Sequence, residues 1–163
     1  MLILKRAALP YGREASYLQA RWLCLRLLGL GFAATFWSLS GDIEGLIGPQ
    51  GLKPAGEFLG GIAQVAPSFS KYLAAPSFLW LGSGPAALRL LCWAGLASSA
   101  LLLFNIFPRA ATLACWALHL SFVAVANEFS AFQSDDLLLE TALLAVFAAP
   151  GGFRPGLGAD TGG

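Results

Sequence analysis

The sequence contains apolar runs that are too long to be buried in a soluble protein of its size. The longest, Leu88–Phe107, has about 20 residues and a single charge, Arg89, and about 20 such residues cross the hydrocarbon core of a bilayer as a helix. Leu23–Leu39, Ala110–Ala126 and Leu137–Ala149 are further apolar runs. Of the 163 residues, 57% are hydrophobic and only 12% are charged. We therefore predict an all-α integral membrane protein.

The predicted architecture is a four-transmembrane-helix bundle within a membrane domain of residues 22–150. The spans are expected at about 23–39, 88–107, 110–126 and 134–149. Pro108-Arg109 is so short a link that the second and third spans must be antiparallel neighbours. The apolar part of the fourth span is about 20 Å long as a helix, against a bilayer core of about 30 Å. Either its acidic flank enters the membrane or neighbouring helices shield it.

The connection between the first two spans, residues 40–85, is rich in turn-forming residues. Ser40-Gly41-Asp42, Gly48-Pro49-Gln50-Gly51 and Gly82-Ser83-Gly84-Pro85 all favour turns. Aromatic residues recur between them, and Ala55–Val65 has the composition of a short helix that lies on the membrane surface. We expect this connection to form an extracytoplasmic loop cap folded on the bundle.

The two terminal segments are expected to lie outside the bundle. Residues 1–21 form a basic segment with a turn-like Pro10-Tyr11-Gly12, and residues 151–163 form a glycine-rich, flexible tail. A basic segment before an apolar run also suits a signal peptide. Arg26 interrupts that run and no A-x-A cleavage site follows, which favours a membrane span. At one turn into the span, Arg26 is expected to reach the lipid headgroups.

Lysine and arginine residues are distributed unequally between the two sides that four crossings define. One side has Lys5, Arg6, Arg13, Arg21, Arg26, Arg109 and Arg154, and the other has Lys53, Lys71 and Arg89. Because loops rich in Lys and Arg stay in the cytoplasm, both termini are predicted to be cytoplasmic. The expected location is the bacterial cytoplasmic (inner) membrane.

Composition argues against several classes of function. A net charge of +1 gives no electrostatic basis for binding nucleic acid. Cys24, Cys92 and Cys115 lie far apart in apolar stretches, without the spacing of a zinc site or redox dithiol. His119 is the only histidine, so we predict no metal site. Phosphate-loop and serine-nucleophile motifs are also absent from the sequence.

Ionisable residues inside the spans are the main candidates for a special role, because charges are costly in a bilayer. Glu140 follows Asp136 by one helical turn, so their carboxyl groups share a face. Arg89 is expected at a similar depth, which predicts a structural Arg89–Glu140 ion pair. Ser134 is the predicted cap of the fourth helix, with Asp135 in its first turn.

A second interpretation gives these residues a chemical role. His119 is predicted to lie in the third span, about 10 Å from its outer end. With Glu140 and Asp136 it would supply the acid and base groups of an enzyme or carrier for a lipid-soluble molecule at the outer membrane face. His119 is also a candidate axial ligand of a tetrapyrrole. The simpler alternative is a hydrogen bond from His119 to a neighbouring helix.

Two stretches of the sequence resemble a known family. The first runs from Arg26 to Ala55 and contains Gly48-Pro49-Gln50-Gly51. The second, Asn127–Thr141, is more specific, because a polar aromatic turn that leads into Leu-Leu-Leu-Glu is an unusual string. Together they resemble the N-terminal membrane portion of the lipase maturation factor family, and the resemblance covers roughly residues 22–150. The residues that carry it include Gly48, Gly51, Pro54, Phe132, Gln133, Asp136 and Glu140.

The resemblance implies a role in protein assembly. The family is distantly similar to the membrane region of vitamin K-dependent carboxylases, and its eukaryotic members act as membrane chaperones in lipase folding. This family role implies a non-enzymatic function. With few polar residues in its spans and no evident catalytic group, the chain is predicted to be a chaperone-like accessory subunit without a cofactor, whose partners are other integral membrane protein subunits and lipids. Family members usually continue with more membrane helices and a sizeable further region. Transport remains a weaker alternative, because the spans show no broken helix.

Overall fold

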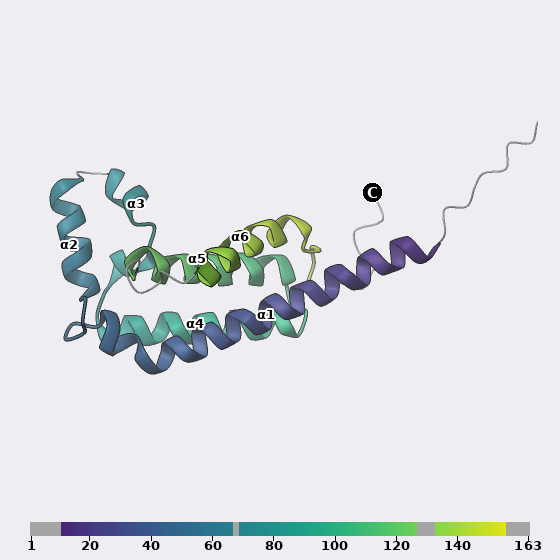
Figure 1. The fold of residues 1–163 in the computed structure, drawn as a ribbon, viewed down its shortest axis with the longest axis horizontal. Helices are drawn as coiled ribbons and strands as arrows, with labels where there is room; N and C mark the ends of the chain where they lie inside the picture. Colours follow the sequence, from purple (N-terminus) through teal and green to yellow (C-terminus); the bar gives the residue numbers. More distant parts are fainter. Residues whose placement is uncertain (1–10, 67–68, 127–132, 156–163) are drawn as a thin grey trace, which may run out of the picture.

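The computed structural model describes residues 11–66, 69–126 and 133–155, and within these ranges every regular element is a helix (Figure 1). The helices are α1 (Tyr11–Ile47), α2 (Ala55–Val65), α3 (Ser70–Ala74), the 3-10 helix η1 (Phe78–Leu81), α4 (Pro85–Leu103), α5 (Pro108–Val125) and α6 (Gln133–Ala148). Three of them are long and apolar enough to cross a membrane, over Tyr17–Ile47, Pro85–Leu103 and Pro108–Val125. The chain is therefore an α-helical membrane protein.

The long helices lie side by side in the order α1, α4, α5, α6. Helix α1 packs along α4, α4 packs on α5, and α5 packs on α6, whereas α6 makes only a small contact with α1. Figure 1 shows α2 lying across one end of these helices. With 16 residues, α6 is about 24 Å long and is shorter than the bilayer core.

Helix α1 is longer than the sequence predicts at both ends. It begins at Tyr11, inside the expected N-terminal segment, and continues through Ser40-Gly41-Asp42, where a turn was expected. Burial explains the correction at residues 40–42, because Ile43 and Ile47 are at most 1% exposed and extend the buried face of the helix. The other members of that face are Leu25, Leu28, Phe32 and Phe36. The N-terminal part of α1 extends beyond the other helices (Figure 1).

The centre of the bundle depends on a close contact between α1 and α4. Phe36 of α1 is fully buried and faces Gly95 of α4, where an added Cβ would lie 2.5 Å from the Phe36 ring. The other side of the ring meets α5, with His119 edge-on at 6.1 Å and Phe122 at 6.4 Å between ring centroids. One aromatic side chain therefore joins three helices.

The connection between α1 and α4 is folded against the end of α5. Its helix α2 has the bounds that the sequence predicts, Ala55–Val65. Ser77 Oγ donates to the Ser121 carbonyl at 2.9 Å, and the Phe78 N–H donates to Ser121 Oγ at 3.2 Å. These two hydrogen bonds fix the start of η1 on α5.

At the opposite end, the segment after α6 is held on the turn between α4 and α5. Asn105 Nδ2 donates to the Pro155 carbonyl at 2.7 Å, and the Phe107 N–H donates to the Phe153 carbonyl at 2.8 Å. The Phe107 and Phe153 rings also meet edge to face at 5.1 Å. The sequence predicts a flexible tail from residue 151, but residues 151–155 are held in place here. Residues 156–163 lie outside the described part of the chain.

Replacing Gly95 by Ala is expected to destabilise the bundle by about 1–3 kcal/mol, because the new methyl group overlaps the Phe36 ring. Gly41→Ala is the matched control, since nothing lies within 4 Å of its added Cβ and alanine favours a helix by about 0.5–1 kcal/mol. Thermal unfolding in detergent, followed by circular dichroism, measures both. A Phe36→Leu change should recover part of the loss in Gly95→Ala; equal stability of Gly95→Ala and wild type would contradict this packing.

Candidate functional site

An ion pair joins the ends of α1 and α4. The guanidinium group of Arg89 binds both carboxylate oxygens of Glu44, with Nε on Oε1 and Nη2 donating to Oε2 at 3.0 Å. Glu44 lies in the last turn of α1 and Arg89 in the second turn of α4. The two side chains are 39% and 66% exposed, so the pair lies at the surface of this end.

This pair corrects the prediction that Arg89 meets Glu140. A Cβ atom added at Gly31 would lie 3.5 Å from Leu138 Cδ1, so the second turn of α6 lies beside Gly31 of α1. About 20 Å of helix separates Gly31 from Glu44, at about 1.5 Å per residue. Arg89 is held at the Glu44 end, so Glu140, two residues after Leu138, lies far from Arg89 along the bundle and is not its partner.

Sequence reasoning missed Glu44 because it placed the residue in a loop. The available signal was the spacing of Phe36, Ile43 and Ile47, which continues one helical face across Gly41 and Gly45. Such a helix brings Glu44 beside the start of the next span. The glycines and polar residues that suggested a turn lie on the exposed or half-buried side of α1.

The family motif Gly48-Pro49-Gln50-Gly51 forms the C-terminal cap of α1. After this turn, the Leu52 and Lys53 N–H groups donate to the carbonyls of Gly45 and Leu46, each at 2.9 Å. The last carbonyls of a helix otherwise lack partners. A Cβ at Gly51 would lie 2.9 Å from the Gly45 carbonyl oxygen, so only glycine fits there without a shift. Pro54 then precedes the first residue of α2.

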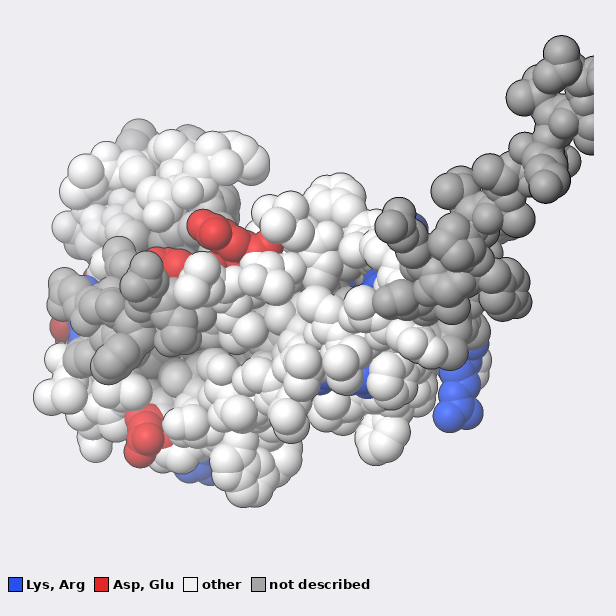
Figure 2. All heavy atoms as spheres, turned by 45° about the vertical axis from the view of Figure 1, so that its right-hand side comes forward, with Lys and Arg blue, Asp and Glu red and all other residues white. Residues whose placement is uncertain are grey.

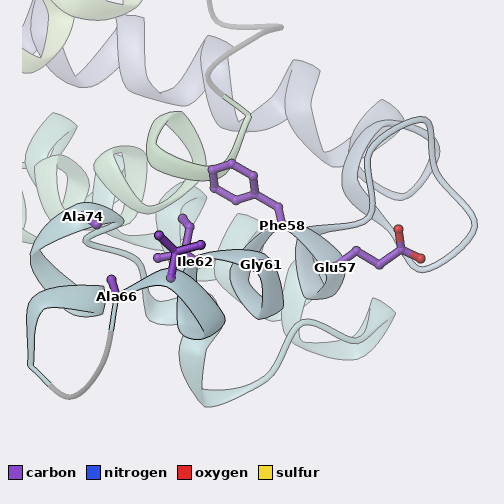
Figure 3. Close-up of a pocket in the computed structure, with 7 residues that line it drawn as sticks. Glu57, Phe58, Gly61, Ile62, Ala66 and Ala74 are labelled. Atoms are coloured by element: carbon purple, nitrogen blue, oxygen red, sulfur yellow. The ribbon is translucent and has the colours of Figure 1, made fainter.

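An apolar hollow of about 530 Å³ lies beside α2 and α3 (Figure 3). It is lined by Glu57, Phe58, Gly61, Ile62, Val65, Ala66 and Ala74. In Figure 3, Ile62, Ala66 and Ala74 lie together around the hollow, whereas the carboxylate of Glu57 points away from them. Val65 is 86% exposed at its edge, which gives this end of the molecule an open apolar surface.

The structure places His119 in the aromatic core. Its side chain is 3% exposed, and its ring lies edge-on to Phe32 at 5.7 Å and to Phe36 at 6.1 Å. Glu140 and Asp136, which the second interpretation groups with His119, are exposed on α6. The imidazole is buried in the core, whereas the two carboxylates lie at the surface of α6. This arrangement does not favour acid–base catalysis by His119, Glu140 and Asp136 together.

Helix α6 presents a mixed acidic and apolar face to its surroundings. Asp136, Glu140, Leu144 and Phe147 recur at intervals of three or four residues, and all four side chains are exposed. Leu144 and Phe147 are 71% and 78% exposed. We call these four residues the α6 outer face. Opposite them, Ala142, Ala145 and Ala149 are buried against the bundle.

Arginine side chains hold the other end of the bundle. Arg26 donates through Nη1 to the carbonyl of Leu102 in the last turn of α4, and Arg109 Nε donates to the Ala149 carbonyl after α6 at 3.1 Å. Both cations therefore lie at C-terminal helix ends, where carbonyls lack partners and the helix dipole is negative. The guanidinium of Arg26, which was expected to reach the headgroups, also lies 5.1 Å from the Trp22 ring.

Acidic and basic side chains are distributed unequally between the two ends of the bundle. On the face seen in Figure 2, acidic side chains lie over the half of the molecule that carries α2, while Lys and Arg side chains are seen at the opposite end and also on the α2 half. We call the part formed by Arg21, Arg26, Arg109 and Arg154 the basic end. Asp42, Glu44 and Glu57 lie at the other end, with Lys53, Lys71 and Arg89.

Some predicted site residues fall where the structure gives no side-chain description. Phe132 lies outside the described residues, and so do the side chains of Gln133, Ser134 and Asp135. The backbone is helical from Gln133, so Ser134 lies within the first turn of α6. Among the described residues, no group of three His, Cys, Asp or Glu side chains is placed to hold a metal ion.

Comparison with known proteins identifies the class of this membrane domain. Residues 19–157 match the family model described as the lipase maturation factor transmembrane domain. Lipase maturation factor 2 of Homo sapiens is 38% identical over 137 residues, covering 80% of this chain and 19% of the human protein. The same protein of Rattus norvegicus is 39% identical over 122 residues, covering 71% of this chain and 17% of the rat protein. No solved structure matches.

The chain belongs to the lipase maturation factor family, as the two sequence motifs predicted. It spans about a fifth of the length of these curated relatives. Lipase maturation factor 2 of Xenopus tropicalis is also similar, at 34% identity over 73% of this chain. These relatives come from vertebrates and give no support to the expected bacterial inner membrane.

Neutralising Glu44 and Arg89 should have coupled effects on stability. Either Glu44→Gln or Arg89→Gln breaks the bidentate pair, so the double variant should lose little more than one single variant. Glu140→Gln is the matched control, and its effect should add to that of Arg89→Gln. Thermal midpoints in detergent at low and high salt measure the coupling. Coupling of Arg89 to Glu140 instead of Glu44 would contradict the observed pairing.

Proposed function

We propose that this chain is the membrane module of a maturation factor, a non-enzymatic, chaperone-like subunit that packs against partner integral membrane proteins. Its family and the names of its relatives support a role in the maturation of other proteins. The observation that carries the packing role is the exposed carboxylate of Glu140 on the α6 outer face.

Glu140 lies at a depth where water is scarce if the bundle is embedded in a bilayer. Leu138, two residues before Glu140, contacts α1 beside Gly31, which lies between Phe36 at the centre of the bundle and Arg26 at the basic end. A charged side chain at the centre of a membrane-spanning helix costs about 2.5–3.5 kcal/mol or more. A partner group that binds the carboxylate removes much of this cost, so the α6 outer face is better suited to a protein partner than to lipid.

The rest of the α6 outer face fits a second helix. Leu144 and Phe147 continue from Glu140 at the spacing of one helical face, and they offer apolar surface beside the carboxylate. The matching partner is a transmembrane helix that carries a basic or hydrogen-bond-donating side chain at the depth of Glu140. Together α6 and such a helix would complete the fourth side of the bundle.

The hollow beside α2 offers a second contact surface outside the membrane. Its lining is apolar, and the hydrogen bonds of Ser121 fix the connection that carries it on the end of α5. We propose that this connection acts as the extracytoplasmic cap and contacts an extracytoplasmic partner segment. The basic end would then face the cytoplasm, in agreement with the distribution of Lys and Arg.

The experiment is a photo-crosslinking series in native membranes. A benzoylphenylalanine at Phe147 should give one dominant adduct with a membrane-embedded polypeptide, and Glu140→Leu should reduce that adduct at least about fivefold, since the donor side chain of the partner loses its acceptor. Asp42→Leu is the control, because it removes an exposed carboxylate from α1 and leaves α6 and the hollow beside α2 unchanged. The crosslinked peptide must come from a transmembrane helix that carries a donor side chain.

A co-expressed lipase tests the maturation role itself. Glu140→Leu should lower the specific activity of the lipase, whereas Asp42→Leu should leave it unchanged. Adducts confined to lipids at Phe147, in protein that remains folded by circular dichroism, would contradict the proposed partner. Unchanged lipase activity after complete removal of this chain would contradict the maturation role for that client.

A further inference from the structure

The small contact between α1 and α6 leaves an apolar groove between these two helices. The groove measures about 580 Å³ and is lined by Ala20, Leu23, Cys24, Leu27 and Leu28 of α1 and by Leu137, Leu138 and Thr141 of α6. No side chain in this lining is charged at neutral pH. On α6 the groove adjoins the outer face, because Leu137 precedes Glu140 by three residues and Thr141 precedes Leu144 by three, but none of the four outer-face residues lines the groove.

The groove opens towards the basic end. Its α1 residues begin at Ala20, immediately before Arg21, and Arg21 lines a small hollow with Asn105, Pro150 and Pro155. Arg109 is exposed and reaches the end of α6 through its hydrogen bond to Ala149. Arg154 is also exposed, on the segment that Phe153 fixes to the α4–α5 turn.

The apolar groove and the arginines near its end are suited to the two parts of an anionic lipid, its acyl chains and its phosphate. Between membrane helices, basic pockets bind the phosphate groups of anionic lipids, and apolar surface accepts their acyl chains. Neither the groove lining nor the lining of the small hollow at Arg21 contains an acidic side chain; the nearest acidic residues along the helices are Asp136 and Glu140 on α6 and Glu14, two turns before Arg21 on α1. We propose that this site binds one anionic phospholipid, with an acyl chain in the α1–α6 groove and its phosphate at Arg109 and Arg154.

Native mass spectrometry of the full chain tests this proposal with defined lipids. Phosphatidylglycerol should remain bound at one equivalent under conditions that strip phosphatidylcholine of the same chains. The double variant Arg109→Gln/Arg154→Gln should weaken phosphatidylglycerol binding at least about tenfold. Lys53→Gln/Lys71→Gln removes the same charge from the opposite end and should leave binding unchanged.

The acyl chain is tested separately from the headgroup. Cys24→Phe fills the groove and should reduce binding of the lipid, whereas Ala97→Phe, at an exposed position of α4, should not. Inorganic phosphate or glycerol phosphate at the same concentration should not compete with the lipid, because neither has an acyl chain. Circular dichroism checks that each variant is folded. If Cys24→Phe is unfolded, Thr141→Leu replaces it as the groove variant, and if the double arginine variant is unfolded, Arg154→Gln alone replaces it as the headgroup variant.

Three results would overturn the proposal. Equal retention of phosphatidylcholine would show that the arginines do not select the lipid, and competition by inorganic phosphate would show a simple anion site. Unchanged lipid binding in folded Cys24→Phe or Thr141→Leu would show that the acyl chain does not lie in the groove. This result is expected if a protein helix fills the groove instead. The proposal does not depend on the partner at Glu140, because Glu140→Leu leaves the groove lining intact.

Discussion

The contact of Phe36 with Gly95 determines how the rest of this bundle is arranged. It allows α1 and α4 to approach closely along their length, and it places the Phe36 ring against His119 and Phe122 of α5. With these two helices antiparallel and in this register, Glu44 meets Arg89 at one end and Arg26 meets the Leu102 carbonyl at the other. The polar contacts at both ends depend on the register that the central packing sets.

The same arrangement leaves α6 incompletely covered. Helix α6 packs on α5 through small residues such as Ala142 and Ala145, and it contacts α1 only over a short stretch. Two unfilled surfaces result, the apolar α1–α6 groove and the α6 outer face with Glu140. The maturation role that we propose for this chain would use surfaces of this kind.

The sequence predicts the class, the helices α2, α4 and α5 and the family correctly, because these depend on local composition and on motifs. It fails at α1, where Gly41 and Asp42 indicate a turn although Ile43 and Ile47 continue a buried face. That error hides Glu44 and leads to the incorrect partner for Arg89. The depth of Glu140 could not be predicted either, because it depends on where α6 begins along α1, which is a tertiary contact.

The most direct test of this arrangement is the position of residues 83 and 154 relative to the membrane. In a background without Cys24, Cys92 and Cys115, single Ser83→Cys and Arg154→Cys variants are treated with a membrane-impermeant maleimide in sealed vesicles. The two ends of the bundle are predicted to lie on opposite sides, so only one variant should react before the vesicles are opened, and both should react afterwards. Reaction of both variants in sealed vesicles of one orientation would contradict the account.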